Sequence, residues 1–258
     1  MSAEEGRNST RGEVLLSLRD LCIRTSERVL VEGVSFDIRQ GKVTAVVGHS
    51  GSGKSVSARA AMGVIDVDPG LIGGHLYFPA VSNRDWFDGV RGAGVAAQRR
   101  LLTETAYLRG GYVTYSPQSA SSALNPGRTI GRQLEMAVLR REKKPLDMAA
   151  AIRDVLAEVG LPPRAAYALP RELSGGMAQR AALAVAVAPR PKILIADEPE
   201  TGLDPVLRRV VTSLMLEVAR GHGVALMLIS HNMETVERVA DEVVRLMPPA
   251  SSHASGAA

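Results

Sequence analysis

One glycine-rich stretch limits what this chain can fold into more than any other feature of its sequence. It follows the pattern G-x-x-x-x-G-K-[ST] and consists of Gly48, His49, Ser50, Gly51, Ser52, Gly53, Lys54 and Ser55. A β-branched apolar run at residues 43–47 precedes it, and a helix-compatible run at residues 56–62 follows it. Strand, loop and helix in this order are the context in which the pattern forms a phosphate-binding loop. A chance glycine- and serine-rich loop would lack those flanks.

Each part of the predicted loop has a physical role towards phosphate. Glycines let the backbone curl until successive N–H groups converge on phosphate oxygens. The helix that follows directs its positive end at the same anion. We therefore expect Lys54 to reach the β- and γ-phosphates of a nucleotide, and the Ser55 hydroxyl to bind Mg²⁺.

Composition narrows the classes of protein that fit. The 258 residues suffice for one large domain, or for a core with a smaller lobe. Aromatic residues make up only 3% of the chain, which argues against a base-stacking surface, so no nucleic-acid partner is predicted. Cys22 is the single cysteine, which excludes an intramolecular disulfide. We expect neither a signal peptide nor a membrane-spanning run, so any membrane role would come through a partner.

The order of the predicted elements indicates an α/β fold. Strands alternate with helices through residues 43–62 and again through residues 175–246, which favours a mainly parallel sheet. Before the glycine-rich loop, two separate short strands are predicted at residues 14–18 and 21–23. After it, residues 74–78 are predicted to form an edge strand.

Three segments are expected to differ from this alternation. Residues 119–172 contain a polar loop, two helix-compatible runs and several prolines, and are predicted to form a helical lobe inserted into the core. Residues 1–12 are rich in Ser, Glu, Arg and Gly, and residues 248–258 consist mostly of small residues. Both ends are predicted to be disordered tails.

A second nucleotide-binding element is predicted where an apolar strand ends in two carboxylates. Residues 193–196 are aliphatic and are followed directly by Asp197 and Glu198. A strand would hold Asp197 rigidly beside Mg²⁺, directly or through water, and Glu198 could then act as general base on the attacking water. A strand followed by a solvated acidic turn is the alternative, and the upstream phosphate-binding loop counts against it.

A third element, Ser174-Gly175-Gly176, precedes a predicted helix. Such a turn is another place where an anion can bind a helix start. Because one copy of the chain already has a loop for its phosphates, a second phosphate-binding turn suggests a nucleotide shared between two copies. On its own, the turn would be explained as well by a simple helix cap, since Ser174 is a good N-cap residue.

Taken together, these segments resemble the ATP-binding cassette (ABC) family. Residues 173–179 are similar to its signature motif, with Met177 where glutamine is commoner. That methionine, with residues 116–118 and 123–126, resembles the ATPases of oligopeptide, dipeptide and nickel importers. The resemblance covers roughly residues 14–246. It implies a P-loop NTPase (RecA-like) core with an antiparallel β subdomain and an inserted α-helical subdomain.

The resemblance implies roles for three further residues. Gln118 is similar to the Q-loop glutamine, which touches Mg²⁺ or the attacking water and senses the transporter partner. Residues 202–205 resemble the D-loop, so Asp204 is expected beside the nucleotide where two copies pack together. His231 follows a predicted core strand and resembles the switch histidine near the γ-phosphate, although a histidine at a strand end is more often a plain surface residue. The implied cofactors are ATP and Mg²⁺. The metal candidates are Ser55, Gln118 and Asp197.

The resemblance also implies a function. An ABC ATPase domain at residues 13–247 would bind and hydrolyse ATP as one subunit of an importer for a small solute such as a peptide, nickel or a metallophore. Its partners would be transmembrane permease subunits and a second ATPase subunit, either identical or a paralogue. The chain would then lie at the cytoplasmic face of the inner (plasma) membrane as a peripheral subunit.

Two alternatives stay open at this stage. A soluble ABC-type ATPase not coupled to a transporter would share the motifs, but the sequence has neither the long coiled-coil insertion of repair members nor the tandem cassettes of translation members. A non-hydrolysing nucleotide-binding module disagrees with the presence of Lys54, Glu198 and His231. It is favoured only by residues 23–25, where the family usually has an adenine-stacking aromatic and this chain has none.

Overall fold

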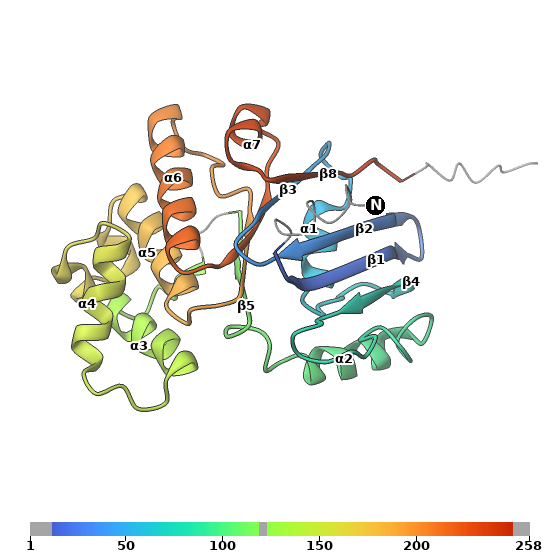
Figure 1. Cartoon of the computed structure of the whole chain (residues 1–258), viewed down its shortest axis with the longest axis horizontal. Helices are drawn as coiled ribbons and strands as arrows, with labels where there is room; N and C mark the ends of the chain where they lie inside the picture. The colour runs from blue at the N-terminus through green and yellow to red at the C-terminus, as the bar shows by residue number, and fades with distance from the viewer. Residues whose placement is uncertain (1–11, 119–122, 250–258) are drawn as a thin grey trace, which may run out of the picture.

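A five-stranded parallel sheet lies at the centre of the molecule (Figure 1). The computed structural model describes residues 12–118 and 123–249. Within them the sheet has the order β5-β6-β7-β3-β8, and each neighbouring pair is parallel. Its strands are β3 (Val43–Val47), β5 (Val113–Ser116), β6 (Ile193–Asp197), β7 (Ala225–Ile229) and β8 (Glu242–Arg245). Parallel neighbours need crossover connections, which the intervening helices supply. The predicted parallel sheet is therefore confirmed.

A second sheet of three antiparallel strands has the order β2-β1-β4. Its strands are β1 (Val14–Thr25), β2 (Val29–Arg39) and β4 (Pro69–Tyr77). The expected edge strand at residues 74–78 is present as β4, but it begins earlier, at Pro69. Pro69 lies opposite Thr25 of β1, so the Pro-Gly pair at residues 69–70 starts the strand.

The prediction of two short strands at residues 14–18 and 21–23 is wrong, because β1 runs through both without interruption. The pairing with β2 shifts register between Leu18 and Leu21, and Asp20 has a φ of 48°. An extra residue of this kind forms a β-bulge, which bends a strand without ending it. Polar Arg19 and Asp20 therefore mark an irregularity inside one strand and not a turn between two.

Seven α-helices and two short 3₁₀ turns are named in the described residues. They are α1 (Lys54–Ala60), α2 (Gly94–Glu104), α3 (Ile130–Arg141), α4 (Met148–Glu158), η2 (Pro163–Tyr167), η3 (Pro170–Glu172), α5 (Gly175–Val187), α6 (Pro205–Gly221) and α7 (Met233–Val239). The last five α-helices begin after side chains that accept a bond from the first turn, namely Thr129, Asp147, Ser174, Asp204 and Asn232. Such caps satisfy N–H groups that have no partner within the helix.

The pleat of the parallel sheet divides the core into two parts. Ile193 and Ile195 of β6 pack with the antiparallel sheet, α1 and α2, whereas Leu194 and Ala196 pack with helices α3 to α6. This follows because successive side chains of a strand point to opposite faces. Every residue of β3, β6 and β7 is buried, as expected for parallel strands covered on both faces.

Helices α3 and α4 pack with α5 on the side of the parallel sheet away from the antiparallel sheet (Figure 1). The predicted fold class, an α/β core with an antiparallel sheet and inserted helices, is thereby confirmed. Residues 119–122, where the helical lobe was expected to begin, lie outside the described residues, as do residues 1–11 and 250–258 of the expected tails. Among the helices that are described, none has the length and apolar character needed to cross a membrane.

Candidate functional site

A cavity of about 640 Å³ opens where β3, β6 and β7 end. These strands are neighbours in the parallel sheet, so the connectors that follow them meet at one edge, which is where open α/β sheets bind ligands. The lining residues are Val47, Gly48, His49, Ser50, Lys54, Glu198, His231, Met233, Arg245, Leu246 and Met247. The structure thus brings together six predicted site residues that are spread over more than 180 positions of the sequence.

The glycines of the loop are required by its shape. Gly51 and Gly53 have φ values of 81° and 86°, in the left-handed region that favours glycine. At Gly48 an added Cβ would lie 2.5 Å from Ser52 Oγ and 2.6 Å from the Leu246 carbonyl oxygen. Any side chain at that position would therefore displace the backbone of the loop.

Lys54 is held inside this loop. Only 7% of the residue is exposed, and its Nζ donates to the carbonyl oxygens of Gly48 at 2.8 Å and His49 at 3.0 Å. Both of these partners are backbone carbonyl oxygens, and no carboxylate pairs with Lys54 among the described residues. Ser52 Oγ is buried there too, with no hydrogen-bond partner in the part of the chain that the structure describes. A buried ammonium and an unpartnered hydroxyl inside a glycine-rich loop fit an anionic ligand, because buried charge is costly until it is paired.

Glu198 lies where the side chains of three different connectors converge. Its Oε2 accepts hydrogen bonds from Gln118 Nε2 at 3.0 Å and Thr201 Oγ1 at 3.2 Å, and His231 Nδ1 is 3.6 Å away. Its backbone N–H donates to the Ile229 carbonyl at the end of β7, and its φ is 45°. A non-glycine residue at positive φ is uncommon and is often found at functional sites.

Asp197 is 4% exposed and accepts a hydrogen bond of 2.7 Å from the Tyr115 hydroxyl. Sheet register explains the contact: Tyr115 of β5 lies opposite Ile195 of β6, and Asp197 follows on the same face two residues later. Burial and the bond to Asp197 raise the pKa of Tyr115 far above its usual value, so the hydroxyl stays a donor. Tyr115 was not among the sequence-predicted site residues.

Gly51, Ser52, Gly53 and Gln118 are not among the residues that line this cavity, and two further groups of predicted residues also lie outside it. Ser55 is exposed at the start of α1, and Asp197 lies behind Glu198 against Tyr115. Ser174, Gly175 and Gly176 are at the start of α5, where the Ser174 hydroxyl accepts from the Met177 N–H at 3.3 Å. Asp204 caps α6 by accepting from the N–H groups of the next helical turn, both at 2.9 Å.

The Ser174 turn and Asp204 are nevertheless tied to the Glu198 connector. Gln179 of α5 is buried, and its Nε2 donates to the Pro199 carbonyl at 2.7 Å. Leu207 of α6 packs so closely on Gly176 that an added Cβ would lie 3.2 Å from it. The start of α5, the start of α6 and the Glu198 connector therefore form one packed unit, of which Ser174 and Gly175 are exposed.

Solved structures of known proteins share this fold. The chain superposes on cbiO1 from Clostridium perfringens, part of the ABC transporter complex cbiONQ, with a TM-score of 0.72 and 21% identity, covering 91% of this chain and 85% of that one. It also matches the dimeric post-hydrolysis state of the ATP-binding cassette MJ0796 bound to ADP and Pi, with a TM-score of 0.70, 20% identity and coverage of 90% and 94%. At these identities the likeness concerns the fold.

Sequence comparison gives relatives of higher identity. The dipeptide transport ATP-binding protein DppD of Escherichia coli (strain K12) is 36% identical over 218 residues, which are 83% of this chain and 62% of DppD. The chain thus spans about six-tenths of that relative's length. The sequence model of the ABC transporter family matches residues 31–201, from β2 to the Glu198 connector. Because this match covers more than half of the sequence and includes the cavity's central residues, the chain belongs to the ABC transporter family.

Proposed function

We propose that this chain is the ATP-binding and ATP-hydrolysing subunit of an ABC importer. The observation that carries the proposal is the single cavity that Lys54, Glu198 and His231 line together. A buried cation, a carboxylate and an imidazole around one opening suit the hydrolysis of a phosphoanhydride, in which catalysis consists largely of positioning and electrostatic stabilisation.

The loop would hold the nucleotide's phosphates. Its backbone and the Lys54 ammonium would bind the β- and γ-phosphates, with Lys54 exchanging its bonds to two loop carbonyls for bonds to phosphate oxygens. Mg²⁺, when bound, would neutralise charge on those oxygens. Ser55, Gln118 and Asp197 would supply oxygen atoms for it, which is the donor type that this cation prefers.

Glu198 would act as general base on the attacking water. Its carboxylate faces the cavity and is oriented by Gln118 and Thr201. His231 is close enough to Glu198 to share that water and would contact the γ-phosphate. The role of Gln118 would be to report the state of the transporter partner to the site, because it is bonded directly to the base.

A second ATPase subunit would complete the site. Ser174 and Gly175 are exposed at a capped helix start and lie outside the cavity, so within one copy they have no contact with the nucleotide position. Facing the cavity of a partner, they would close over its phosphates, with Asp204 beside them. The dimeric ATP-binding cassette with the same fold supports this arrangement.

A groove of about 570 Å³ beside α3 is the proposed place for a permease segment. Its lining includes Leu124, Met136, Arg128 and Arg140, of which Met136 is 49% exposed. Tyr115 also lines it and donates a hydrogen bond to Asp197, which links the groove to a proposed Mg²⁺ ligand. Through a permease, the chain would be a peripheral subunit at the cytoplasmic face of the membrane.

The solute is proposed to be a peptide or a similarly small molecule, such as nickel or a metallophore. The relative DppD is named for dipeptide transport, and this supports the peptide. A soluble ABC-type ATPase without a transporter is the alternative. Purification from detergent-solubilised membranes separates the two, because an importer subunit would be recovered with a multi-span partner and a soluble ATPase would not.

Phosphate release from ATP by the purified chain tests the proposed activity. Glu198→Gln should lower kcat by about 100-fold or more, as expected for loss of a general base, while ATP still binds. Lys54→Ala should instead weaken ATP binding, since it removes the buried cation. Glu234→Gln and Lys42→Ala are the matched controls, because they alter an exposed glutamate paired with Arg209 and a lysine paired with Asp241, neither of which lines the cavity. Unchanged hydrolysis in Glu198→Gln would contradict the proposal.

A further inference from the structure

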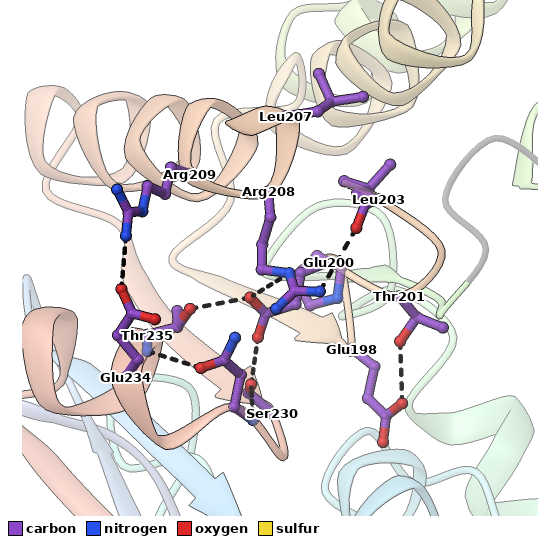
Figure 2. Close-up of polar contacts among 12 residues, drawn as sticks. Glu198, Glu200, Thr201, Leu203, Leu207, Arg208, Arg209, Ser230, Glu234 and Thr235 are labelled. Carbon is purple, nitrogen blue, oxygen red and sulfur yellow. Dashed lines mark hydrogen bonds and ion pairs between the residues drawn. The ribbon is translucent and has the colours of Figure 1, made fainter. Parts of the chain in front are cut away.

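Glu200 is a buried carboxylate two residues beyond Glu198, in the connector from β6 to α6. Only 3% of it is exposed. Figure 2 shows its side chain directed toward Ser230 and Thr235, whereas Glu198 points to the other side, beside Thr201. Burying a carboxylate is costly unless its oxygens are hydrogen-bonded or paired, so the groups around Glu200 determine what it does.

Both Glu200 oxygens accept hydrogen bonds from the segment that runs from the end of β7 to the first turn of α7. The Ser230 hydroxyl donates to Oε1, and the Thr235 hydroxyl donates to Oε2 at 3.0 Å. Ser230 and Thr235 are themselves buried. Arg208 of α6 adds a positive charge, with Nε 3.8 Å from Oε2. The carboxylate is therefore fixed from two sides, by α6 and by the start of α7.

Ser230 and the first turn of α7 also hold the backbone next to His231. Ser230 Oγ also accepts from the Asn232 N–H at 3.0 Å, and Asn232 Oδ1 accepts from the Thr235 N–H at 3.2 Å. His231 therefore lies between two residues, Ser230 and Asn232, that are bonded to each other, although its own ring is mostly exposed and lies 3.6 Å from Glu198. The placement of the ring thus depends on what holds Ser230 and Asn232.

Glu198 and Glu200 belong to one hydrogen-bonded turn. The Thr201 N–H donates to the Glu198 carbonyl at 3.1 Å, and the Leu203 N–H donates to the Glu200 carbonyl at 3.2 Å. One carboxylate of the turn faces the cavity and the other faces the His231 loop. A shift of the loop relative to the turn would therefore change the distance between the imidazole and Glu198.

We propose that Glu200 is a positioning residue: its buried carboxylate fixes the loop 230–232 against the turn that carries Glu198, and so sets the separation of His231 from Glu198. This inference rests on the proposed ATPase function of the site and deepens it. It predicts that Glu200 affects the rate of hydrolysis through His231, without touching nucleotide.

The direct test is the histidine ring signals in ¹H–¹³C NMR spectra of the nucleotide-free full chain, with His231→Ala used to assign the His231 signal. Glu200→Ala should shift or broaden the signal of His231 and leave that of His75, which is bonded to Asp85 in the antiparallel part, unchanged. Arg209→Ala is the matched control, because it removes only the exposed pair with Glu234 between the same helices (Figure 2).

Steady-state kinetics give the second readout. Glu200→Ala should lower kcat by about 10-fold, since displacing a catalytic group by 1 Å can cost roughly 100-fold. The KM for ATP should change by less than about 2-fold, because the loop around Lys54 is intact. Glu200→Gln keeps one acceptor oxygen and should recover most of the rate. Glu158→Ala, which removes a carboxylate paired with Arg190 far from the cavity, controls for lost stability.

An unchanged His231 signal in Glu200→Ala would overturn the inference. It would also be overturned if Glu158→Ala lost as much stability as Glu200→Ala and its kcat fell by the same factor. Should Glu200→Ala not fold, Thr235→Val removes one of the two hydroxyl donors at nearly constant volume, and the same shift and a smaller fall in kcat are expected. A moved His231 signal in a chain whose wild type releases no phosphate would reject the proposed function and leave the placement by Glu200 standing.

Discussion

The hydrogen bond from Tyr115 to Asp197 leads to the most specific prediction of the structure. Tyr115→Phe removes one hydroxyl, keeps the ring that packs against the core, and leaves a carboxylate that is 4% exposed without this donor. Hydrogen bonds to charged groups contribute about 1.5–3 kcal/mol. We expect the free energy of unfolding to fall by about 2 kcal/mol, which lowers the melting temperature by about 6 °C in a chain of this size.

The functional consequence concerns Mg²⁺. Without the hydroxyl, Asp197 loses the contact that orients it, so we expect the Mg²⁺ concentration that half-saturates ATP hydrolysis to rise by about 10-fold, the lower end of the usual effect for groups that orient metal ligands. Because burial and the bond to Asp197 raise the pKa of Tyr115, the hydroxyl is protonated throughout the neutral range and the effect should not vary between pH 6 and 9.

Tyr112→Phe is the matched control for Tyr115→Phe. Tyr112 is half-buried three residues earlier, and its hydroxyl donates to the Leu15 carbonyl at 3.0 Å, away from the cavity. It should lose about 1 kcal/mol of stability, as for a bond between neutral groups, and keep the wild-type response to Mg²⁺. Thermal unfolding in EDTA and Mg²⁺ titration of phosphate release measure the two effects. Equal Mg²⁺ responses in both variants would refute the orienting role of Tyr115.

Two further predictions concern the groove and the pairing of Glu158 with Arg190 and His222. Met136→Arg places charge in the apolar groove. It should abolish co-purification with a permease, while the isolated chain still releases phosphate from ATP. Full recovery of a permease with this variant would contradict the groove as its docking place. Burial raises the pKa of Glu158, but bonds from Arg190 and His222 outweigh it and hold the pKa below its usual value. Its stabilising effect is therefore complete above pH 4.5 or so and is lost as pH falls through the lowered value. Glu158→Gln should flatten that acid loss in urea unfolding curves, and an unchanged curve would refute the pairing.

Local signals in the sequence were sufficient to predict the parallel core. Helices α3, α5 and α7 carry such signals, because apolar spacing and a good cap mark each of them. Six of the residues that line the cavity were predictable for a similar reason, since the glycine-rich loop, Glu198 and His231 each come soon after a core strand. Strand ends in a parallel sheet meet at one edge.

Contacts that depend on strand order could not be predicted from local sequence patterns. Tyr115 reaches Asp197 only because β5 and β6 are neighbours in a specific register, and these strands are far apart in the chain. Glu200 looks like a solvated acid in the sequence, since nothing local indicates that Ser230 and Thr235 will bury it. The bulge in β1 has the same explanation, because pairing with β2 and β4 overrides a polar interruption at Asp20.

The central claim is that ATP is held between the glycine-rich loop of one copy and the Ser174 turn of another. Crosslinking tests it most directly. One variant combines Ser50→Cys and Arg171→Cys, both at exposed positions, with Cys22→Ser to remove the native thiol and Glu198→Gln to prevent hydrolysis. This variant is treated with a short bifunctional maleimide. The account predicts covalent dimers joining Cys at 50 to Cys at 171 with ATP and Mg²⁺, and few without nucleotide. Absence of that crosslink in a chain saturated with ATP would contradict it.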